Sequence, residues 1–496
     1  MSVKDWESGA HHLFQTHIVG TGSDTGTVSN CIWKTFPNLW RVAWALDTVN
    51  DYFALFPNEV TQKVNGSPRS LYEDIYRRFL TATGGNWWDD YGWGGIMALR
   101  AAESGLYPAA AQEEFVKIAI NSYCYMYGPG WRTDGAPTQN WFYVPYLWAS
   151  GWFRLLFLRN RGRNIGAPNV YANAPDPVVH TPKANLKPKF PGGIWNVSMA
   201  GLKPSGYPKT VQNAPDPGTN FITNLLAIQN TVTNGLHALM ALRLLKAFHN
   251  PAWKHLFTDR GVEPAKLFAY WSGQMQWFDQ WFGETGAACM KYSLGASGAL
   301  IRERAPQFGS NLWDAAYYST LVWSGDQGIM LGIVNDLQQA RANPQAWVGD
   351  LGPIPDLLNF PLASDLMTGV YDCLYETEDG TLLLRPWAMV TLDGNGKPKS
   401  DFPFDFEHDP GDYITGCGTF YRYLGQFAAS GGQISSGYVQ RISDAADAVL
   451  KMKSPDVSGC ECVADRGGPS YDSPCDALTP WINRLATLCL AIQLNR

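Results

Sequence analysis

The stretch Leu236–Phe248 reads LHALMALRLLKAF, and its apolar side chains follow the period of an α-helix. Leu239, Met240 and Leu244 follow the first leucine at positions i+3, i+4 and i+8, which lie on one side of a helix. A half-buried strand would instead need apolar and polar residues in alternation. We therefore expect a long helix over residues 222–249.

The same spacing recurs along most of the chain, as in Met330, Ile333 and Val334, and strand-like alternation is confined to short pieces such as Thr381–Leu384. The chain is therefore expected to be all-α. Because no Gly/Ser-rich or charged linker divides the helices, residues 1–496 are expected to form a single domain. Helices are predicted at 38–55, 68–81, 92–105, 110–126, 142–158, 222–249, 263–283, 312–321, 327–342, 355–375, 413–429, 434–453 and 478–494.

Two segments depart from this pattern. Residues 161–220 hold ten of the 32 prolines and seven glycines, and because proline is excluded from helix interiors we expect a long inserted loop or flap that shapes one end of a cleft. The C-terminal segment 455–496 holds four of the nine cysteines and is expected to pack on the helical domain. These cysteines form either a disulfide-tied loop or free thiols, and their spacing lacks the paired C-x-x-C of structural zinc sites.

Composition excludes several classes of protein. Charged residues make up only 17% of the chain, aromatic residues 14%, and the net charge is −6 with no basic block, which argues against a nucleic-acid partner. The 45% hydrophobic content excludes a disordered chain, and no apolar run reaches the roughly 18 residues of a membrane span. The N-terminus has no secretory signal, but the compartment stays open: cytoplasmic as the sequence is written, or secreted if a signal has been removed. We expect a monomer.

Several predicted helices begin with a similar phrase, in which tryptophans, polar residues and glycines precede the apolar run. If alternate helices line one barrel, these phrases gather at one end of it. Tryptophan rings there would offer flat apolar faces to sugar rings, and glycines would let the backbone approach a ligand closely. Core packing is the alternative explanation for part of the tryptophans. The phrases occupy residues 87–93, 230–235, 323–328 and 412–418.

The adjacent pair Asp89-Asp90 is the sharpest chemical signal. Hydrolysis of a glycosidic bond needs one ionised and one protonated carboxyl group, which lie about 5–5.5 Å apart in retaining enzymes. Packed among tryptophans, one carboxyl would stay protonated through desolvation and its neighbour's charge. The alternative is a helix cap, because aspartate at a helix start satisfies free N–H groups and suits the positive end of the dipole.

Other motifs are weaker. The acidic run from Asp401 to Asp412 could supply oxygen ligands to calcium, but its spacing does not match an EF-hand and its interleaved phenylalanines favour a packed loop. The histidines show no metal-binding spacing, and His11, His12 and His237 are interpreted as structural. No phosphate-binding loop and no G-x-S-x-G phrase occur. We therefore expect no metal and no cofactor.

The residues in these phrases resemble a known family. Residues 86–93, Asn-Trp-Trp-Asp-Asp-Tyr-Gly-Trp, and the following helix ending in Ala-Ala-Glu103 resemble the Tyr-Tyr-Asp-Asp-like catalytic phrase of glycoside hydrolase family 76. The resemblance runs from about residue 33 to 430. Further segments resemble that family in the same order: 39–52, 192–195, 233–245, 323–328 and 418–424.

This resemblance implies an (α/α)6 barrel of six helical hairpins and a retaining, α-1,6-mannanase-like glycosidase that acts on an oligo- or polysaccharide. It implies Asp89 as nucleophile and Asp90 as general acid/base. The residues implied as walls and subsites are Trp87, Trp88, Tyr91, Asn234, Trp323, Asp326, Gln327 and Arg422.

The sequence also departs from the family. Gly325-Asp326 replaces its Tyr-Asn, and Cys417 replaces a lysine, so the chemistry carries over better than the substrate. Two alternatives stay open at this point. One is a related barrel enzyme, such as another α-glycosidase, a transglycosylase or an epimerase. The other is a non-catalytic glycan-binding protein, for which an adjacent carboxyl pair would have no use.

Overall fold

A computed structural model describes residues 1–20, 39–61, 88–127, 190, 192–194, 230–285, 289–303, 320–378, 381–394, 397–401, 413–451 and 479–496. Within these ranges the chain is mostly helical, as expected from the apolar spacing. The predicted helices at 68–81 and 142–158 lie outside the described residues, as does nearly all of the segment 161–220. None of the described helices is long and apolar enough to cross a membrane.

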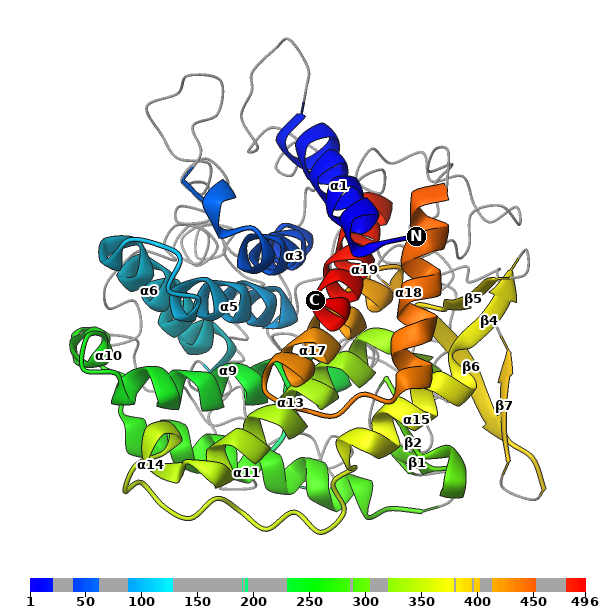
Figure 1. Cartoon of the computed structure of the whole chain (residues 1–496). Coiled ribbons are helices and arrows are strands. Elements are labelled where there is room, and N and C mark those ends of the chain that lie inside the picture. Colours follow the sequence, from blue (N-terminus) through cyan, green and yellow to red (C-terminus); the bar gives the residue numbers. More distant parts are fainter. Residues whose placement is uncertain are drawn as a thin grey trace, which may run out of the picture.

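Six helices form the centre of the molecule (Figure 1). In sequence order each packs against the next, and α19 packs against α3 as well as α17. They are α3 (Leu39–Leu55), α5 (Trp88–Glu103), α9 (Thr231–His249), α13 (Ser324–Ala342), α17 (Gly416–Ala429) and α19 (Thr479–Asn495).

The first two turns of these six helices lie against one another, as Trp40 does against Trp93, and Gly418 of α17 against Asn483 of α19 and Trp44 of α3. Contacts continue in the same order further along, as between Gly332 of α13 and Tyr423 of α17, so neighbouring helices run in the same direction. A Cβ added to Gly235 in α9 would lie 2.5 Å from Ile329 of α13. A Cβ added to Gly328 of α13 would lie 2.6 Å from Cα of Phe420 in α17. The starts of all six helices therefore lie at one end of the molecule, where the tryptophan- and glycine-containing phrases also lie.

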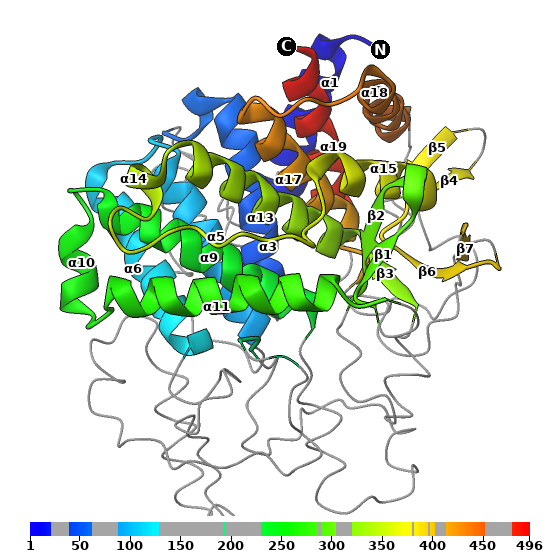
Figure 2. The same cartoon turned by 90° about the horizontal axis from the view of Figure 1, so that it is seen from below.

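Burial separates these helices from those outside them. In α9, sixteen of the nineteen residues are buried, whereas α18 buries only five of sixteen and has a polar outer face. Figure 2 shows α11 running along the outside of α9. The outer helices are α1 (Val3–Leu13), α6 (Ala109–Tyr127), α11 (Pro264–Phe282), α15 (Ala363–Cys373) and α18 (Ser436–Lys451). Shorter elements are η1 (Phe14–Gly20), η2 (Pro57–Glu59), α10 (Lys254–Asp259), η8 (Gly295–Ser297) and α14 (Pro344–Trp347).

Short antiparallel strands lie beside α15 and α18 (Figure 1). One sheet has the order β3-β6-β7, with Trp323 opposite Trp387 and Met389 opposite Asp401. Two hairpins pair β1 with β2 and β4 with β5. The strands are β1 (Lys291–Ser293), β2 (Ala299–Ile301), β3 (Leu321–Trp323), β4 (Tyr375–Glu378), β5 (Thr381–Leu384), β6 (Trp387–Leu392) and β7 (Pro398–Asp401).

Three helix predictions need correction. The helix predicted at 355–375 begins only at Ala363, because Pro361 and the prolines before it keep the chain out of a helix. Of the helix predicted at 312–321, residues 312–319 lie outside the described residues, and Leu321 starts strand β3 instead. Helix α1 was not predicted; a capping box between Ser2 and Asp5 stabilises its start.

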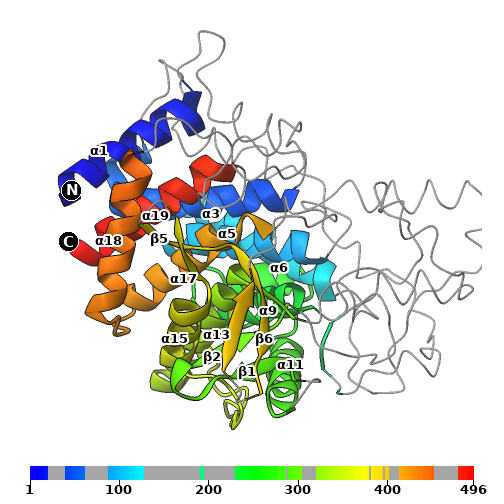
Figure 3. The same ribbon diagram turned by 90° about the vertical axis from the view of Figure 1, so that its right-hand side faces the viewer.

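The two ends of the chain lie close together (Figure 3). The amino group of Met1 is 2.7 Å from Asp447 in α18, and Arg496 pairs with Glu7 in α1. Helix α19, in the predicted C-terminal segment 455–496, packs between α17 and α3 and is buried along most of its length.

Candidate active site

The Asp89–Asp90 pair lies in the first turn of α5, which begins at Trp88. From the sequence this helix was expected to begin at residue 92, which would have left the pair in the preceding loop. In the structure the helix begins four residues earlier, so the pair belongs to the helix itself. Asp90 is buried, with 5% of its surface exposed, and Asp89 is half-buried. Consecutive residues leave a helix about 100° apart, so the two carboxyl groups have different surroundings. Both lie at the positive end of the helix dipole.

The start of α5 is held close to α9. A Cβ added to Gly92 would lie 2.8 Å from Cβ of Leu236, which is too close for any residue other than glycine. This glycine was predicted to let a ligand approach the backbone; in the structure it lets a neighbouring helix do so. The contact fixes the helix turn that carries the two aspartates.

Four aromatic side chains, which we call the aromatic row, connect the starts of the inner helices. Trp40 of α3 lies 6.3 Å from Trp93 of α5, and Trp93 lies 6.3 Å from Trp323, measured between ring centroids. Trp323 lies 6.1 Å from Tyr413 and donates its Nε1 hydrogen to the Tyr413 carbonyl. Trp93 is four residues after Asp89 and hence on the same side of α5.

The aromatic row contains only one of the predicted site residues, Trp323. Trp93 and Tyr413 occur in the phrases that preceded the predicted helices, so a signal for them was present in the sequence. Trp40 lies outside those phrases, and its signal was the resemblance of segment 39–52 to the family. Trp93 and Trp323 are buried, whereas Trp40 is half-buried.

The remaining predicted wall residues differ in their settings. Tyr91 is buried on α5, and Asp326 is completely buried in the first turn of α13. Trp87 lies outside the described residues, and of Trp88 only the backbone is described.

Asn234 is the fourth residue of α9, and its amide is wholly engaged inside the protein. Its Oδ1 accepts hydrogen bonds from the backbone N–H of Ile194 at 2.8 Å and from Nε2 of Gln274 at 3.0 Å. Its Nδ2 donates to the carbonyls of Ile194 at 3.0 Å and Asn230 at 2.8 Å. Two sequence phrases, Gly-Gly-Ile and Thr-Asn-Gly, are thereby joined.

Gln327 is the fourth residue of α13 and makes the same kind of contact. Its Oε1 accepts a hydrogen bond from the Ile301 N–H at 2.8 Å. Its Nε2 donates to the carbonyls of Ile301 at 2.7 Å and Trp323 at 3.0 Å. Neither amide has exposed surface.

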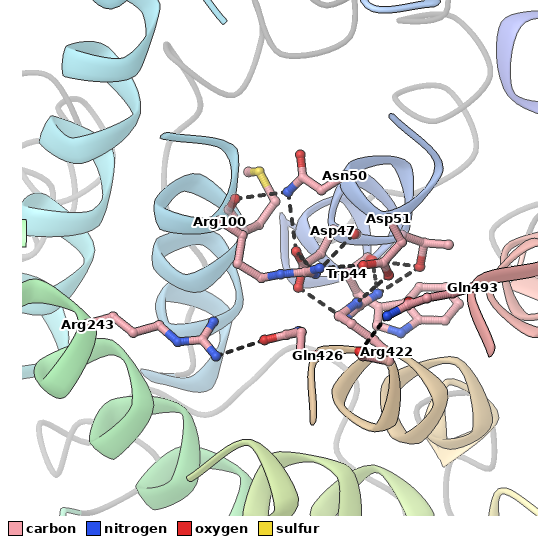
Figure 4. A network of polar contacts seen from close by, with 12 residues as sticks. Trp44, Asp47, Asn50, Asp51, Arg100, Arg243, Arg422, Gln426 and Gln493 are labelled. Atoms are coloured by element: carbon pink, nitrogen blue, oxygen red, sulfur yellow. Dashed lines mark hydrogen bonds and ion pairs between the residues drawn. The ribbon is translucent and has the colours of Figure 1, made fainter. Parts of the chain in front are cut away.

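Arg422 lies inside a buried polar network between α3, α5 and α17 (Figure 4). It donates to the Trp44 carbonyl and to Oγ1 of Thr48, both at 2.7 Å, and lies 3.3 Å from Asp47. Arg100 pairs with Asp47 at 2.5 Å. The guanidinium of Arg422 therefore joins α17 to α3.

The buried network around Arg100 and Arg422 lies far from Asp89 and Asp90 along α5. Ten residues separate Asp90 from Arg100, which corresponds to about 15 Å along the helix at roughly 1.5 Å per residue. Arg243 of α9 is also buried among the inner helices. It pairs with Asp336 at 2.6 Å and donates a hydrogen bond to Gln426 at 2.8 Å.

No metal site is evident in the described part of the chain, where no three His, Cys, Asp or Glu side chains come together. Most of the acidic run, residues 402–412, lies outside the described residues. Asp401 is the last residue of β7.

Comparison with known proteins gives solved structures only. No protein-family model matches the chain, and no curated protein matches it. Dfg5 from Chaetomium thermophilum, in complex with glucosamine, is 13% identical over 99% of this chain and 90% of that chain, with a TM-score of 0.49. The Lin0763 protein from Listeria innocua is 12% identical over 99% and 97%, with a TM-score of 0.47. The GH76A α-1,6-mannanase from Salegentibacter sp. HEL1_6 is 12% identical over 99% and 98%, with a TM-score of 0.45. The family that the sequence motifs resemble is thus also represented among the similar structures.

Proposed function

We propose that this chain is a retaining glycoside hydrolase that cleaves α-linked, mannan-like glycans on an (α/α)6 barrel. The observation that supports it most directly is the placement of Asp89 and Asp90 together in the first turn of α5. That turn lies at the end of the inner helices where the aromatic row also lies.

The different burial of the two aspartates favours different roles. Asp90 is buried, and burial disfavours a second negative charge beside an existing one. Asp89 is half-buried, so water can solvate its charge, while the helix dipole acts on both carboxyl groups alike. We therefore assign Asp90 as the general acid/base and Asp89 as the ionised nucleophile.

The reaction would proceed in two displacements. Asp89 attacks the anomeric carbon while Asp90 donates a proton to the leaving oxygen, which breaks the glycosidic bond and forms a covalent glycosyl-enzyme. Asp90, now ionised, takes a proton from water, and the resulting hydroxide displaces Asp89. Two inversions retain the α configuration. Trp87, Trp88, Tyr91 and Trp323 would form the wall around the sugar, whereas Asp326 has no exposed surface and is not assigned to it.

Single substitutions of the aspartates test this proposal. Asp89→Asn removes the nucleophile and should lower turnover at least about 10³-fold on every substrate. Asp90→Asn should retain much more activity on an aryl α-mannoside with a good leaving group than on a natural glycan, because little proton donation is then needed. Added azide should rescue Asp90→Asn and give the α-glycosyl azide.

A matched control is available in the same helix. Glu103 ends α5 and pairs with Lys246 at 3.3 Å, so Glu103→Gln removes a carboxylate from α5 away from its first turn. Its turnover should stay near that of the unsubstituted protein. Unchanged activity in both aspartate variants would make the pair a helix cap. A β-glycosyl azide would mean that the two roles are exchanged or that the enzyme inverts.

A further inference from the structure

The amides of Asn234 and Gln327 make the same three contacts at equivalent positions of two neighbouring helices. Each is the fourth residue of its helix, accepts the N–H of one isoleucine, donates to that isoleucine's carbonyl, and donates to the carbonyl four residues before itself. We call these the amide clamps. Their isoleucine partners are Ile194 and Ile301.

The donor capacity of these two amides is used up by the protein. A primary amide has two N–H donors, and both donors of each clamp go to backbone carbonyls at 2.7–3.0 Å. Both side chains are also fully buried. A direct bond from either amide donor to a sugar hydroxyl would therefore require breaking a clamp.

The Asn234 clamp holds a piece of the proline-rich insertion. Besides Ile194, which is buried, Phe190 lies edge-to-face on Trp281 of α11 with ring centroids 5.0 Å apart. Gly192 has φ of 106°, and a Cβ there would lie 2.3 Å from a backbone carbonyl of α11. The described part of the insertion is thus docked between α9 and α11.

The Gln327 clamp holds the segment 301–303, which connects the starts of two inner helices. The first N–H of α9, at Thr231, donates to the Glu303 carbonyl at 2.8 Å. The N–H of Glu303 donates to the Leu321 carbonyl at 3.1 Å. Leu321 lies in β3, which ends at Trp323 in the aromatic row. A shift of segment 301–303 would therefore be passed to the aromatic row.

We propose that Asn234 and Gln327 are positioning residues of the glycosidase site, which act on substrate binding through the two backbone segments they hold. This inference rests on the proposed function. Catalysis and binding are sensitive to displacements of about 1 Å in groups that hold a substrate. Loss of either clamp should therefore weaken glycan binding without removing the carboxyl pair on α5.

Hydrogen exchange, measured by mass spectrometry on the full chain, tests the clamps without reference to activity. Asn234→Ala should speed exchange in the peptide that covers 192–194 and leave the peptide covering 299–303 unchanged. Gln327→Ala should have the opposite effect. Gln493→Ala is the matched control, because its Nε2 also donates to a backbone carbonyl, that of Gly425, at 2.7 Å but near the far end of α19; it should change neither peptide.

Kinetics test the positioning role. On an α-mannan oligosaccharide each clamp variant should raise KM about tenfold, whereas kcat on a small activated aryl mannoside should stay within about twofold. Gln493→Ala should change neither constant. An equal loss of kcat on both substrates, with KM unchanged, would overturn the positioning role.

The remaining outcomes separate failure of the clamps from failure of the proposed function. If the alanine variants do not fold, Asn234→Leu and Gln327→Met nearly keep the size of the side chain, place no charge in the buried site and lose both donors, and the same peptides are compared. Exchange that is unchanged, or that rises uniformly over all peptides, would overturn the clamps themselves. A protein with local exchange effects but no glycan hydrolysis would leave the clamps in place and refute the proposed function, and the positioning role with it.

Discussion

Asp47 is an enclosed carboxylate between the guanidinium groups of Arg100 and Arg422, and its side chain is only 2% exposed. Its replacement by asparagine would leave two buried cations to share the single carboxylate of Asp51. Removing one partner of a buried ion pair costs about 3–5 kcal/mol. We expect Asp47→Asn to lower the free energy of unfolding by about 3 kcal/mol, measured by urea denaturation.

The control is an exposed pair of the same chemistry. Glu114 and Lys117 lie 2.7 Å apart on the surface of α6, and solvent screens such pairs. Glu114→Gln should leave the urea midpoint almost unchanged. Equal midpoints for the two variants would mean that the buried network adds nothing to stability.

The half-buried ring of His17 makes the stability of the protein depend on pH. Its ring stacks on Trp481 with centroids 3.5 Å apart, and burial, followed by the charges of His12 and Arg484, lowers the pKa of His17 from 6.5 to about 4. The folded protein therefore binds fewer protons than the unfolded chain between these two values. Stability is lost as the pH falls from about 6.5 to about 4.

His17→Phe should keep the stack and remove this part of the pH dependence. The flattening should be on the order of 1 kcal/mol, because the half-buried ring is partly screened by solvent, and thermal unfolding at several pH values measures it. An NMR titration of the His17 ring near pH 6.5 would contradict the prediction.

Glycines allow neighbouring inner helices to approach closely, and Gly328 of α13 is the clearest case. A Cβ there would lie 2.6 Å from Cα of Phe420 in α17, which is backbone and has no side-chain freedom to move aside. We expect Gly328→Ala to destabilise the protein by about 1–3 kcal/mol, in spite of alanine's better helix propensity. Urea denaturation measures the change.

Gly394 provides the comparison, because a Cβ at that position meets nothing within 4 Å. Gly394→Ala should leave the free energy of unfolding nearly unchanged. If Gly328→Ala were equally harmless, the close approach of α13 and α17 would not depend on this glycine.

Local patterns account for the elements that could be predicted. Helix α3 was predicted at 38–55 and spans Leu39–Leu55, because its apolar residues recur at helical spacing; the helix also buries polar residues such as Asp47 and Thr48. The hairpin strand Thr381–Leu384 was visible from its alternation. Strand β3 was not, because its three residues pair with Trp387–Met389, far along the chain.

The same distinction applies to the site. The Asp89–Asp90 pair is local, so its place at a helix start could be predicted within four residues. The contacts of Asn234 and Gln327 could not, because their partners Ile194 and Ile301 are 40 and 26 residues away. The family resemblance implies that Asn234 and Gln327 contact the substrate. In the structure both amides form hydrogen bonds with backbone groups of the protein.

At the scale of the whole molecule, the packing of α19 between α17 and α3 brings the last helix beside the first inner one. Helix α1 then packs on α19 and contacts α18, and Trp6 donates to Asp447 at 2.7 Å. Elements from both ends of the chain thus depend on each other. This arrangement is what the expected single domain over residues 1–496 requires.

Three cysteines provide a test of that single domain; Cys373 and Cys489 are buried and Cys124 is half-buried. Cys124 lies in α6, Cys373 ends α15, and Cys489 lies in α19, so they report on parts of the molecule far apart in sequence. Burial raises the pKa of Cys124 and Cys373 to about 12 and raises that of Cys489 as well. With a pKa near 12, only about one thiol in 10⁴ is ionised at pH 8, so alkylation of the folded protein should be very slow.

Unfolding exposes these thiols and returns their pKa values to the ordinary range. In a series of urea concentrations, a short pulse of iodoacetamide followed by peptide mass spectrometry should label all three cysteines with one common midpoint, because a single cooperative unit loses all its buried contacts together. That midpoint should move to lower urea in Asp47→Asn by the same amount at each cysteine. Separate midpoints, or a shift confined to Cys489, would divide the chain into independently unfolding parts and contradict the single domain.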